Sequence, residues 1–311
     1  MEYRLLGPLE LCDGERRVAL RGPRQRALLA ALLVSVNEAV PESVLLERLW
    51  GDEQPASGSA ALRVRVSQLR KLVGDAIVTR PPGYMLSAPA ESLDSLRFER
   101  LVGEGYRIAA QDPEHASAVL RQALALWRGP ALADVGPLPF AEAEAERLDE
   151  LRLAALEHVL EAELALGRHA EAVSELDALV AEQPLRENLR RLLMLALYRS
   201  GRQARALDVY RRGRARLVDE LGIEPGEALR ELEAAILRHD PELYRCAAAA
   251  AVSDERKLGT IVVVAPAAPG VTETLVEAGA SVERADARMV VAAFGAPFAQ
   301  EDHAERALRT A

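Results

Sequence analysis

Residues 59–73 constrain the fold of this chain more than any other segment, because one predicted helix there combines an apolar stripe with a basic face. Four apolar residues recur at the spacing that places side chains on one side of an α-helix: Leu62, Val66, Leu69 and Val73. Ser59 can cap the start of this helix, and Gly74 can end it. The pattern therefore predicts a helix with one buried side and one outward side.

The outward side of this helix carries side chains that suit nucleic acid. It presents Arg63, Val64, Ser67, Arg70 and Lys71, with Arg65 and Gln68 at its flanks. The chain has a formal net charge of -9, yet no acidic residue lies between Glu53 and Asp75. The major groove of B-DNA admits one α-helix, in which arginine can pair with guanine and valine can touch a thymine methyl group. We expect this face to contact DNA.

The next residues, AIVTRPPGYMLSA, alternate around a Pro81-Pro82-Gly83 turn and predict a β-hairpin. Arg80 stands beside its tip, where the wing of a winged helix reaches the DNA backbone or the minor groove. A basic helix face taken alone is more often only a solvated surface, so that alternative stays open for residues 59–73 by themselves. The hairpin directly after the helix favours DNA binding.

The residues upstream predict the remainder of a winged helix-turn-helix over residues 1–90. Two short strands, YRLLGPLEL and RRVALRG, are joined by a polar turn that Gly14 permits. Apolar residues at helical spacing predict a first helix over residues 24–36 and a second that opens at Pro41 and Glu42 and runs to Trp50. Strands, three helices and a hairpin follow one another in the order of a winged helix.

From Ser95 onward the pattern is helical, and it contains one internal repeat. The segment LGRHAEA at 166–172 recurs as SGRQARA at 200–206, an offset of 34 residues that equals the tetratricopeptide period. The second copy runs on to Gly222, as a longer closing helix would. Stacked helices of this kind commonly present a surface to a protein partner. A tetratricopeptide scaffold acting mainly through protein–protein contacts is therefore an alternative function.

The end of the chain changes character again. Residues 244–254 predict a linker, and the β-branched runs KLGTIVVVAPA and MVVAAFGAP predict a partial α/β segment over residues 255–311. The sequence thus predicts a mainly α, multidomain fold. Its parts are a winged helix-turn-helix with a small N-terminal β-sheet, a tetratricopeptide-like helical domain over residues 94–243, the linker and the partial α/β segment.

Several function classes lack support in the sequence. The longest uncharged apolar run, residues 27–36, is far shorter than the roughly 20 residues that span a bilayer, and the N-terminus lacks a leader pattern. Cys12 and Cys246 stand outside metal or redox motifs, the histidines lack metal-ligand spacing, and there is no GxxxxGK[ST] phosphate loop. We predict a cytoplasmic protein with no membrane partner, no metal, no cofactor and no enzymatic activity.

Two stretches resemble known families. Residues 1–90 look like the OmpR-type winged helix, carried by the run from Arg63 to Gly74 and by TRPPGY. The helical domain resembles the bacterial transcriptional activation domain, carried by ALWRGPALADV, EQPLRENLRRLLMLALYRSGRQARAL and DELGIEPGEALRELEAAIL. In this order the two domains resemble the Streptomyces antibiotic regulatory protein (SARP) family.

This resemblance implies a transcription activator, often of antibiotic biosynthetic genes. Such a protein binds direct repeats in double-stranded promoter DNA as a homodimer and contacts the RNA polymerase holoenzyme with its sigma factor. Carried onto this chain, the resemblance places the outward residues of 59–73 in the major groove and Arg80 in the wing contact. It places Arg21 and Arg24 against nearby phosphates. No receiver domain precedes the winged helix, so phosphorylation of such a domain is not the expected switch.

The C-terminal segment is similar to the start of a class III nucleotide cyclase domain, through ERKLGTIVVV and MVVAAFGAPFAQEDHAERAL. That chemistry needs two metal-binding carboxylates. Aligned without gaps, Ala265 and Arg288 occupy those positions, and Asp286 reaches the second only after a two-residue shift. We therefore predict a degenerate remnant without cyclase activity.

Overall fold

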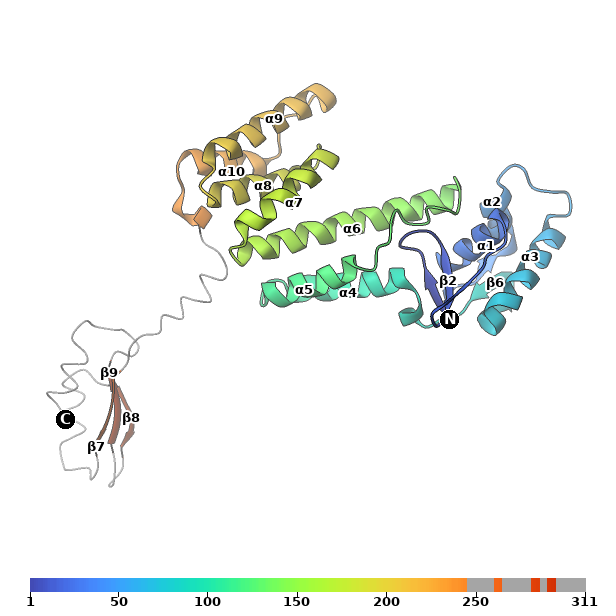
Figure 1. Cartoon of the computed structure of the whole chain (residues 1–311), viewed down its shortest axis with the longest axis horizontal. Helices are drawn as coiled ribbons and strands as arrows, with labels where there is room; N and C mark the ends of the chain where they lie inside the picture. Colours follow the sequence, from blue (N-terminus) through green and yellow to red (C-terminus); the bar gives the residue numbers. More distant parts are fainter. Residues whose placement is uncertain (245–259, 265–280, 286–289, 295–311) are drawn as a thin grey trace. The chain divides into compact units, whose positions relative to one another are not determined.

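The computed structural model describes residues 1–244 and the segments 260–264, 281–285 and 290–294 (Figure 1). The chain divides into two compact units, Met1–Tyr244 and Arg245–Ala311. The first unit holds both the strands and helices of the predicted winged helix and those of the predicted helical domain, so the predicted mainly α fold is confirmed. No helix in the described ranges is long and apolar enough to cross a membrane.

Three short strands open the chain, where the sequence predicted two. They form an antiparallel sheet in the order β1 (Glu2–Arg4), β2 (Glu10–Asp13) and β3 (Arg16–Val18). The tight turn between β2 and β3 includes Gly14, whose φ of 58° suits a residue without a side chain. The predicted turn is therefore confirmed, but the predicted first strand is divided into two.

The division has a direct cause in residues 5–9, which we call the junction segment. Asp94 accepts hydrogen bonds from the backbone N–H groups of Leu5 and Leu6 at 2.7 and 3.1 Å. Asp134 accepts one from Leu9 at 2.6 Å. N–H groups held by side chains cannot join a strand ladder, so an apolar run that looks like one continuous strand is interrupted.

The winged helix follows, with one strand that the sequence analysis missed. Its elements are α1 (Pro23–Leu33), β4 (Val40–Pro41), α2 (Glu42–Trp50), α3 (Gly58–Val73), the 3₁₀ turn η1 (Gly74–Ala76), β5 (Ile77–Arg80) and β6 (Gly83–Leu86). The strand β6 lies between β4 and β5 in an antiparallel sheet. A Cβ atom on Gly83 would overlap the backbone of Val40, so β4 and β6 require glycine at this crossing. The predicted hairpin is confirmed, whereas a two-residue strand such as β4 has no readable period.

One predicted helix boundary and one predicted helix cap are wrong. The first helix ends at Leu33 and not at residue 36, because Asn37 adopts a φ of 65° and donates its N–H to Leu86 O at 2.8 Å. The third helix starts one residue before the predicted cap Ser59. Ser57 stands at its N-cap without a side-chain capping bond.

The remainder of the first unit is helical. It contains the 3₁₀ turn η2 (Ala90–Ser92), α4 (Asp94–Ile108), α5 (Pro113–Leu124), α6 (Pro139–Ala165), α7 (His169–Glu182), α8 (Glu187–Arg199), α9 (Gln203–Leu221), α10 (Glu227–Leu237) and the 3₁₀ turn η3 (Pro241–Tyr244). The two copies of the 34-residue repeat place Gly167 and Gly201 in the turns before α7 and α9, with φ values of 81° and 74°. The longer closing helix predicted for the second copy is α9, which Gly222 ends in a left-handed conformation.

The junction segment packs the winged helix against α4–α6. Leu6 lies in the core that α4, α5 and α6 share, whereas Leu132 and Val135 lie in the core of the winged helix. Arg128 N donates to Leu6 O at 2.8 Å, and Leu132 N donates to Leu5 O at 3.0 Å. Side chains of each predicted domain therefore pack in the core of the other, and backbone hydrogen bonds connect the two.

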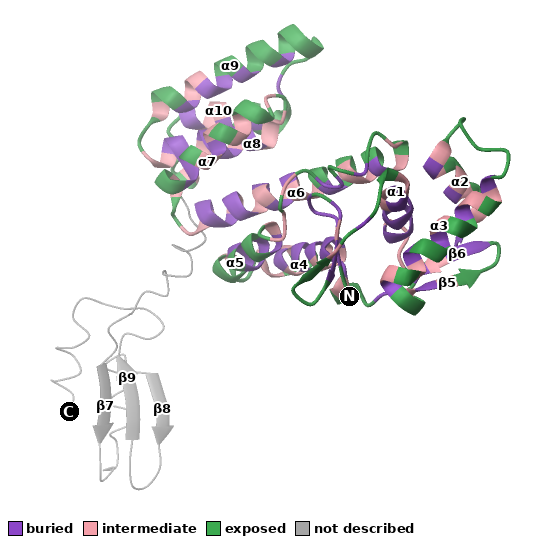
Figure 2. Ribbon diagram, turned by 45° about the vertical axis from the view of Figure 1, so that its right-hand side comes forward, coloured by how far each residue is buried: buried purple, intermediate pink, exposed green. Residues whose placement is uncertain are grey.

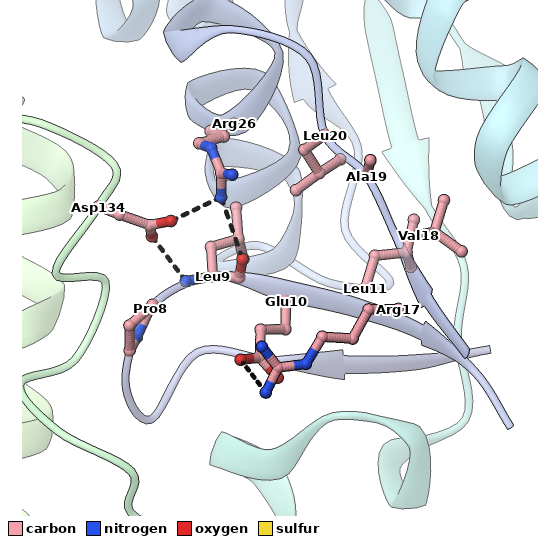
Figure 3. A pocket seen from close by; sticks show the side chains of 10 residues that line it. All are labelled: Pro8, Leu9, Glu10, Leu11, Arg17, Val18, Ala19, Leu20, Arg26 and Asp134. Atoms are coloured by element: carbon pink, nitrogen blue, oxygen red, sulfur yellow. Dashed lines mark hydrogen bonds and ion pairs between the residues drawn. The ribbon is translucent and has the colours of Figure 1, made fainter. Parts of the chain in front are cut away.

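A charged contact reinforces this packing (Figure 3). Arg26 on α1 donates to Asp134 Oδ2 at 2.5 Å and to Leu9 O at 3.2 Å, while Asp134 Oδ1 accepts from Leu9 N. Arg128 Nη1 also lies 3.0 Å from Glu10 Oε1 on β2. The junction segment is thus held both by α1, through Arg26, and by the loop between α5 and α6, through Asp134 and Arg128.

The second unit contributes β7 (Thr260–Val264), β8 (Ser281–Ala285) and β9 (Val290–Phe294). The strand β9 pairs antiparallel with both neighbours, in the order β7-β9-β8. Two of these strands were predicted and β8 was not. The predicted linker beyond Tyr244 and the three positions that bear on cyclase chemistry lie outside the described residues, namely Ala265, Asp286 and Arg288.

Asp94 supplies a test of the junction. Burial raises the pKa of its carboxyl group, and the backbone hydrogen bonds from Leu5 and Leu6 oppose that rise. Asp94→Asn leaves one acceptor oxygen for two N–H groups and points an amide donor at one of them. We expect the free energy of unfolding to fall by about 1–3 kcal/mol, the cost of an unsatisfied buried group.

Urea unfolding at neutral pH measures this loss. Asp75→Asn is the matched control, because Asp75 is exposed in η1, and it should change stability by no more than about 0.5 kcal/mol. Equal stability of the two variants would show that the junction does not depend on the Asp94 carboxylate.

Candidate nucleic-acid interface

The helix α3 divides into a buried side and an open side, as predicted. Leu62, Val66 and Leu69 are at most 1% exposed, and they pack in the core of the winged helix with Val73. Figure 2 shows the exposed side of α3 next to the β5–β6 hairpin. The packing of the stripe fixes which residues of α3 face solvent.

Five of the seven predicted contact residues of α3 lie on this open side. The exposed ones are Arg63, Val64, Ser67, Gln68 and Lys71. Val64 is 55% exposed, although valine is usually buried. Arg65 is half-buried and donates to Gln68 Oε1 at 3.2 Å. We call the five exposed residues the open face of α3.

Arg70 occupies a different position from the one that the sequence suggested. Its Nε donates to Ile77 O at 2.9 Å, and its Nη2 donates to Thr79 Oγ1 at 2.9 Å. Its guanidinium also lies 5.9 Å from the centre of the Tyr84 ring. Arg70 therefore joins α3 to both strands of the wing, and it is half-buried in doing so.

The other three predicted contact residues also differ in their exposure to solvent and in their hydrogen bonds. Arg80 is exposed at the end of β5, and Arg21 is exposed just before α1. Arg24 is half-buried, donates to Leu49 O and lies 5.7 Å from the centre of the Trp50 ring. Arg24 thus links α1 to α2.

One acidic group near the open face was missed. Glu42 at the start of α2 places its Oε1 3.8 Å from Arg63 Nε. The Arg63 side chain stays 69% exposed in this pair. Since Glu42 lies 21 positions before Arg63 in the chain, only a prediction of how α2 packs on α3 could have found it.

Comparison with known proteins agrees with this architecture. Residues 15–86 match the family described as "Transcriptional regulatory protein, C terminal", and residues 93–237 match the "Bacterial transcriptional activator domain". Regulatory protein DnrI of Streptomyces peucetius is 38% identical over 79% of this chain and 95% of its own length. Transcriptional regulator RedD of Streptomyces coelicolor is 37% identical over 78% of this chain and 72% of its own length.

The chain belongs to the SARP family of transcription regulators. Regulatory protein AfsR of Streptomyces coelicolor is 45% identical over 81% of this chain, but the match spans only 26% of the length of AfsR. A solved structure, Mycobacterium tuberculosis EmbR in complex with a low affinity phosphopeptide, matches 85% of this chain and 75% of its own. That match has a TM-score of 0.75 and 36% identity.

The open face of α3 lies within the residues that match the first of these two families. Both matched families are described by a role in transcription. The described residues contain no group of three or more side chains that could hold a metal ion. The open face of α3 presents two cationic side chains, Arg63 and Lys71, with Val64, Ser67 and Gln68 between them.

Arg70 and Lys71 are neighbours with contrasting surroundings, which makes a stability test possible. Arg70→Ala removes two hydrogen bonds and the ring contact that hold the wing, so we expect a loss of about 1–3 kcal/mol in the free energy of unfolding. Lys71→Ala removes the same charge from an exposed position and should change stability by less than about 0.5 kcal/mol. Chemical denaturation of both variants decides, and equal losses would refute the role of Arg70 in holding the wing.

Proposed function

We propose that this protein is a sequence-specific activator that binds direct repeats in promoter DNA through its winged helix. In this proposal it acts as a homodimer on DNA and recruits the RNA polymerase holoenzyme through its sigma factor. Its targets are the genes of a secondary-metabolite cluster, as the family resemblance implies. The protein acts in the cytoplasm by recruitment and catalyses no reaction of its own.

The observation that carries this proposal is the open face of α3. An exposed valine between Arg63 and Ser67 contributes nothing to the core, but it suits a thymine methyl group in the major groove. Arg63 and Lys71 stand at either end of this face and supply positive charge for guanine edges or phosphates. Ser67 is short enough to let the helix approach the bases closely.

The remaining residues divide into two groups in this proposal. Arg80 on the wing, Arg21, Arg65 and Gln68 contact the DNA backbone or the groove edges. Arg24 and Arg70 act by position, because their donors already serve Leu49, Ile77 and Thr79. Because Arg70 already connects the wing to α3, less conformational entropy is lost when both bind DNA.

Arg63→Ala tests the DNA contact directly. We expect the affinity for the neighbouring promoter to fall about 5- to 150-fold, the range of one good arginine–base pair. If Arg63 binds phosphate, the slope of log K against log salt also falls by about 0.9. Arg107→Ala is the control, because Arg107 is an exposed arginine on α4 with the same charge.

Gel-shift titration at several salt concentrations supplies both numbers. The proposal fails if Arg63→Ala and Arg107→Ala bind the promoter equally tightly with equal salt slopes. Footprinting with RNA polymerase on the same promoter tests recruitment separately, since it reports the spacing of the repeats and the added protection by polymerase.

Glu42→Gln tests the same face in the opposite direction. The carboxylate of Glu42 competes for Arg63 and repels phosphate, so its removal should raise DNA affinity about two- to fivefold. The gain should shrink as salt rises, because exposed charges are screened. Unchanged affinity at low salt would show that the Glu42 carboxylate does not compete with DNA for Arg63.

A further inference from the structure

A second basic site lies far along the chain, between α7, α8 and α9. It is a cavity of about 290 Å³ to which Arg190, Arg212 and Arg216 contribute, and we call it the arginine pocket. Its apolar lining comes from Val180, Ala181, Leu193 and Val209. No DNA contact proposed above uses these residues.

Arg190 is the unusual member of the arginine pocket. It is only 5% exposed on α8, and its hydrogen bond is to the backbone carbonyl of Pro184. A guanidinium has five N–H donors, so most of this buried donor capacity is unused. No carboxylate of the described residues forms an ion pair with Arg190. Buried charges are ordinarily paired, because desolvation of an unpaired charge is costly.

The surroundings of Arg190 add positive charge instead of compensating it. Burial lowers the pKa of Arg190, and the charges of Arg216 and Arg212 lower it further, while Glu187 acts in the opposite direction. The carboxylate of Glu187 itself accepts from the backbone N–H of Gly226 at 2.7 Å. The only acid that lines the pocket, Asp177, pairs with Arg205 at 2.6 Å.

The fold makes specific room for this arrangement. A Cβ atom on Gly213 would overlap the guanidinium of Arg190, so α9 passes closely over that group only because residue 213 is glycine. Arg212 and Arg216 lie one residue before and three residues after this glycine on α9, and both line the pocket. Both hold exposed partners on their own helix, Asp208 at 2.8 Å and Glu220 at 2.6 Å. Exposed pairs of this kind contribute little free energy and exchange readily for another anion.

We propose that the arginine pocket binds a small organic anion, whose carboxylate or phosphate group pairs with Arg190, Arg212 and Arg216. The apolar part of the ligand packs on the valine and leucine side chains of the lining. A volume of about 290 Å³ stands at the lower end of the range for small-molecule sites, which favours a low-molecular-weight ligand. The pocket gives the helical domain an effector site, and this inference does not rest on the proposed DNA contacts.

Isothermal titration calorimetry of the full chain at constant ionic strength tests the proposal. The probes are phenyl phosphate, benzoate, inorganic phosphate and the neutral benzamide. We expect saturable one-site binding of at least one of the two aromatic anions, weaker binding of inorganic phosphate and none of benzamide. The comparison of phenyl phosphate with benzoate decides which head group the site prefers.

Neighbouring arginines on α9 provide a matched control. Arg211 and Arg212 both pair with Asp208, but only Arg212 lines the pocket. Arg212→Gln and Arg216→Gln should each raise the Kd at least about fivefold, because each removes a charge-assisted contact. Arg211→Gln loses the same charge and should change the Kd less than about twofold. All three residues are well exposed, so these variants should keep the fold, which circular dichroism can verify.

Arg190→Lys adds a test of the buried group, since it keeps the charge but loses the planar fork and should weaken binding. The proposal is overturned if neither aromatic anion binds saturably or if benzamide binds equally well. It is also overturned if Arg211→Gln weakens binding as much as Arg212→Gln, which would indicate general attraction of anions to α9.

Discussion

The structure of the first unit depends on two aspartates that accept hydrogen bonds from backbone N–H groups, the buried Asp94 and the exposed Asp134. Asp94 and Asp134 hold Leu5, Leu6 and Leu9 in a segment that is neither strand nor helix. Without those acceptors the N–H groups of this segment would be buried and unsatisfied, at about 1–3 kcal/mol each. With them, the segment can send Leu6 into one core and Leu9 into the other. The winged helix and the helical part of this SARP protein consequently belong to one compact unit.

The winged helix packs against α4–α6 through several hydrogen bonds and ion pairs. The junction segment, Arg128 and the Arg26–Asp134 pair hold α3 at a defined place relative to α4–α6. Under the proposed function, a position on DNA then sets the position of the helical domain with little further loss of entropy. Preorganisation of this kind strengthens binding without adding contacts.

Arginine has two distinct uses in this protein, and they are distinguished by what surrounds each guanidinium. Arg63 and Arg80 stay open to solvent and keep their charge available to a partner. Arg24, Arg48 and Arg70 donate to backbone carbonyl groups and lie near aromatic rings, where they connect one element to the next. Arg190 belongs to neither group, since it is buried and largely without acceptors. The anion proposed for the arginine pocket would supply acceptors for this guanidinium.

The sequence by itself determined the order of the elements, the buried stripe of α3 and the open face with Arg63 and Val64, because helical and hairpin periodicities are local properties of the chain. Family resemblance could be recognised from the same local runs. Tertiary structure decided that residues 3–11 are not one strand, that Arg70 on α3 donates hydrogen bonds to the wing and that Glu42 faces Arg63. The partners in these contacts are backbone groups or side chains from other elements. Apart from proline, every residue has the same backbone N–H and C=O groups, so no side-chain pattern reveals which of them an arginine or an aspartate will meet.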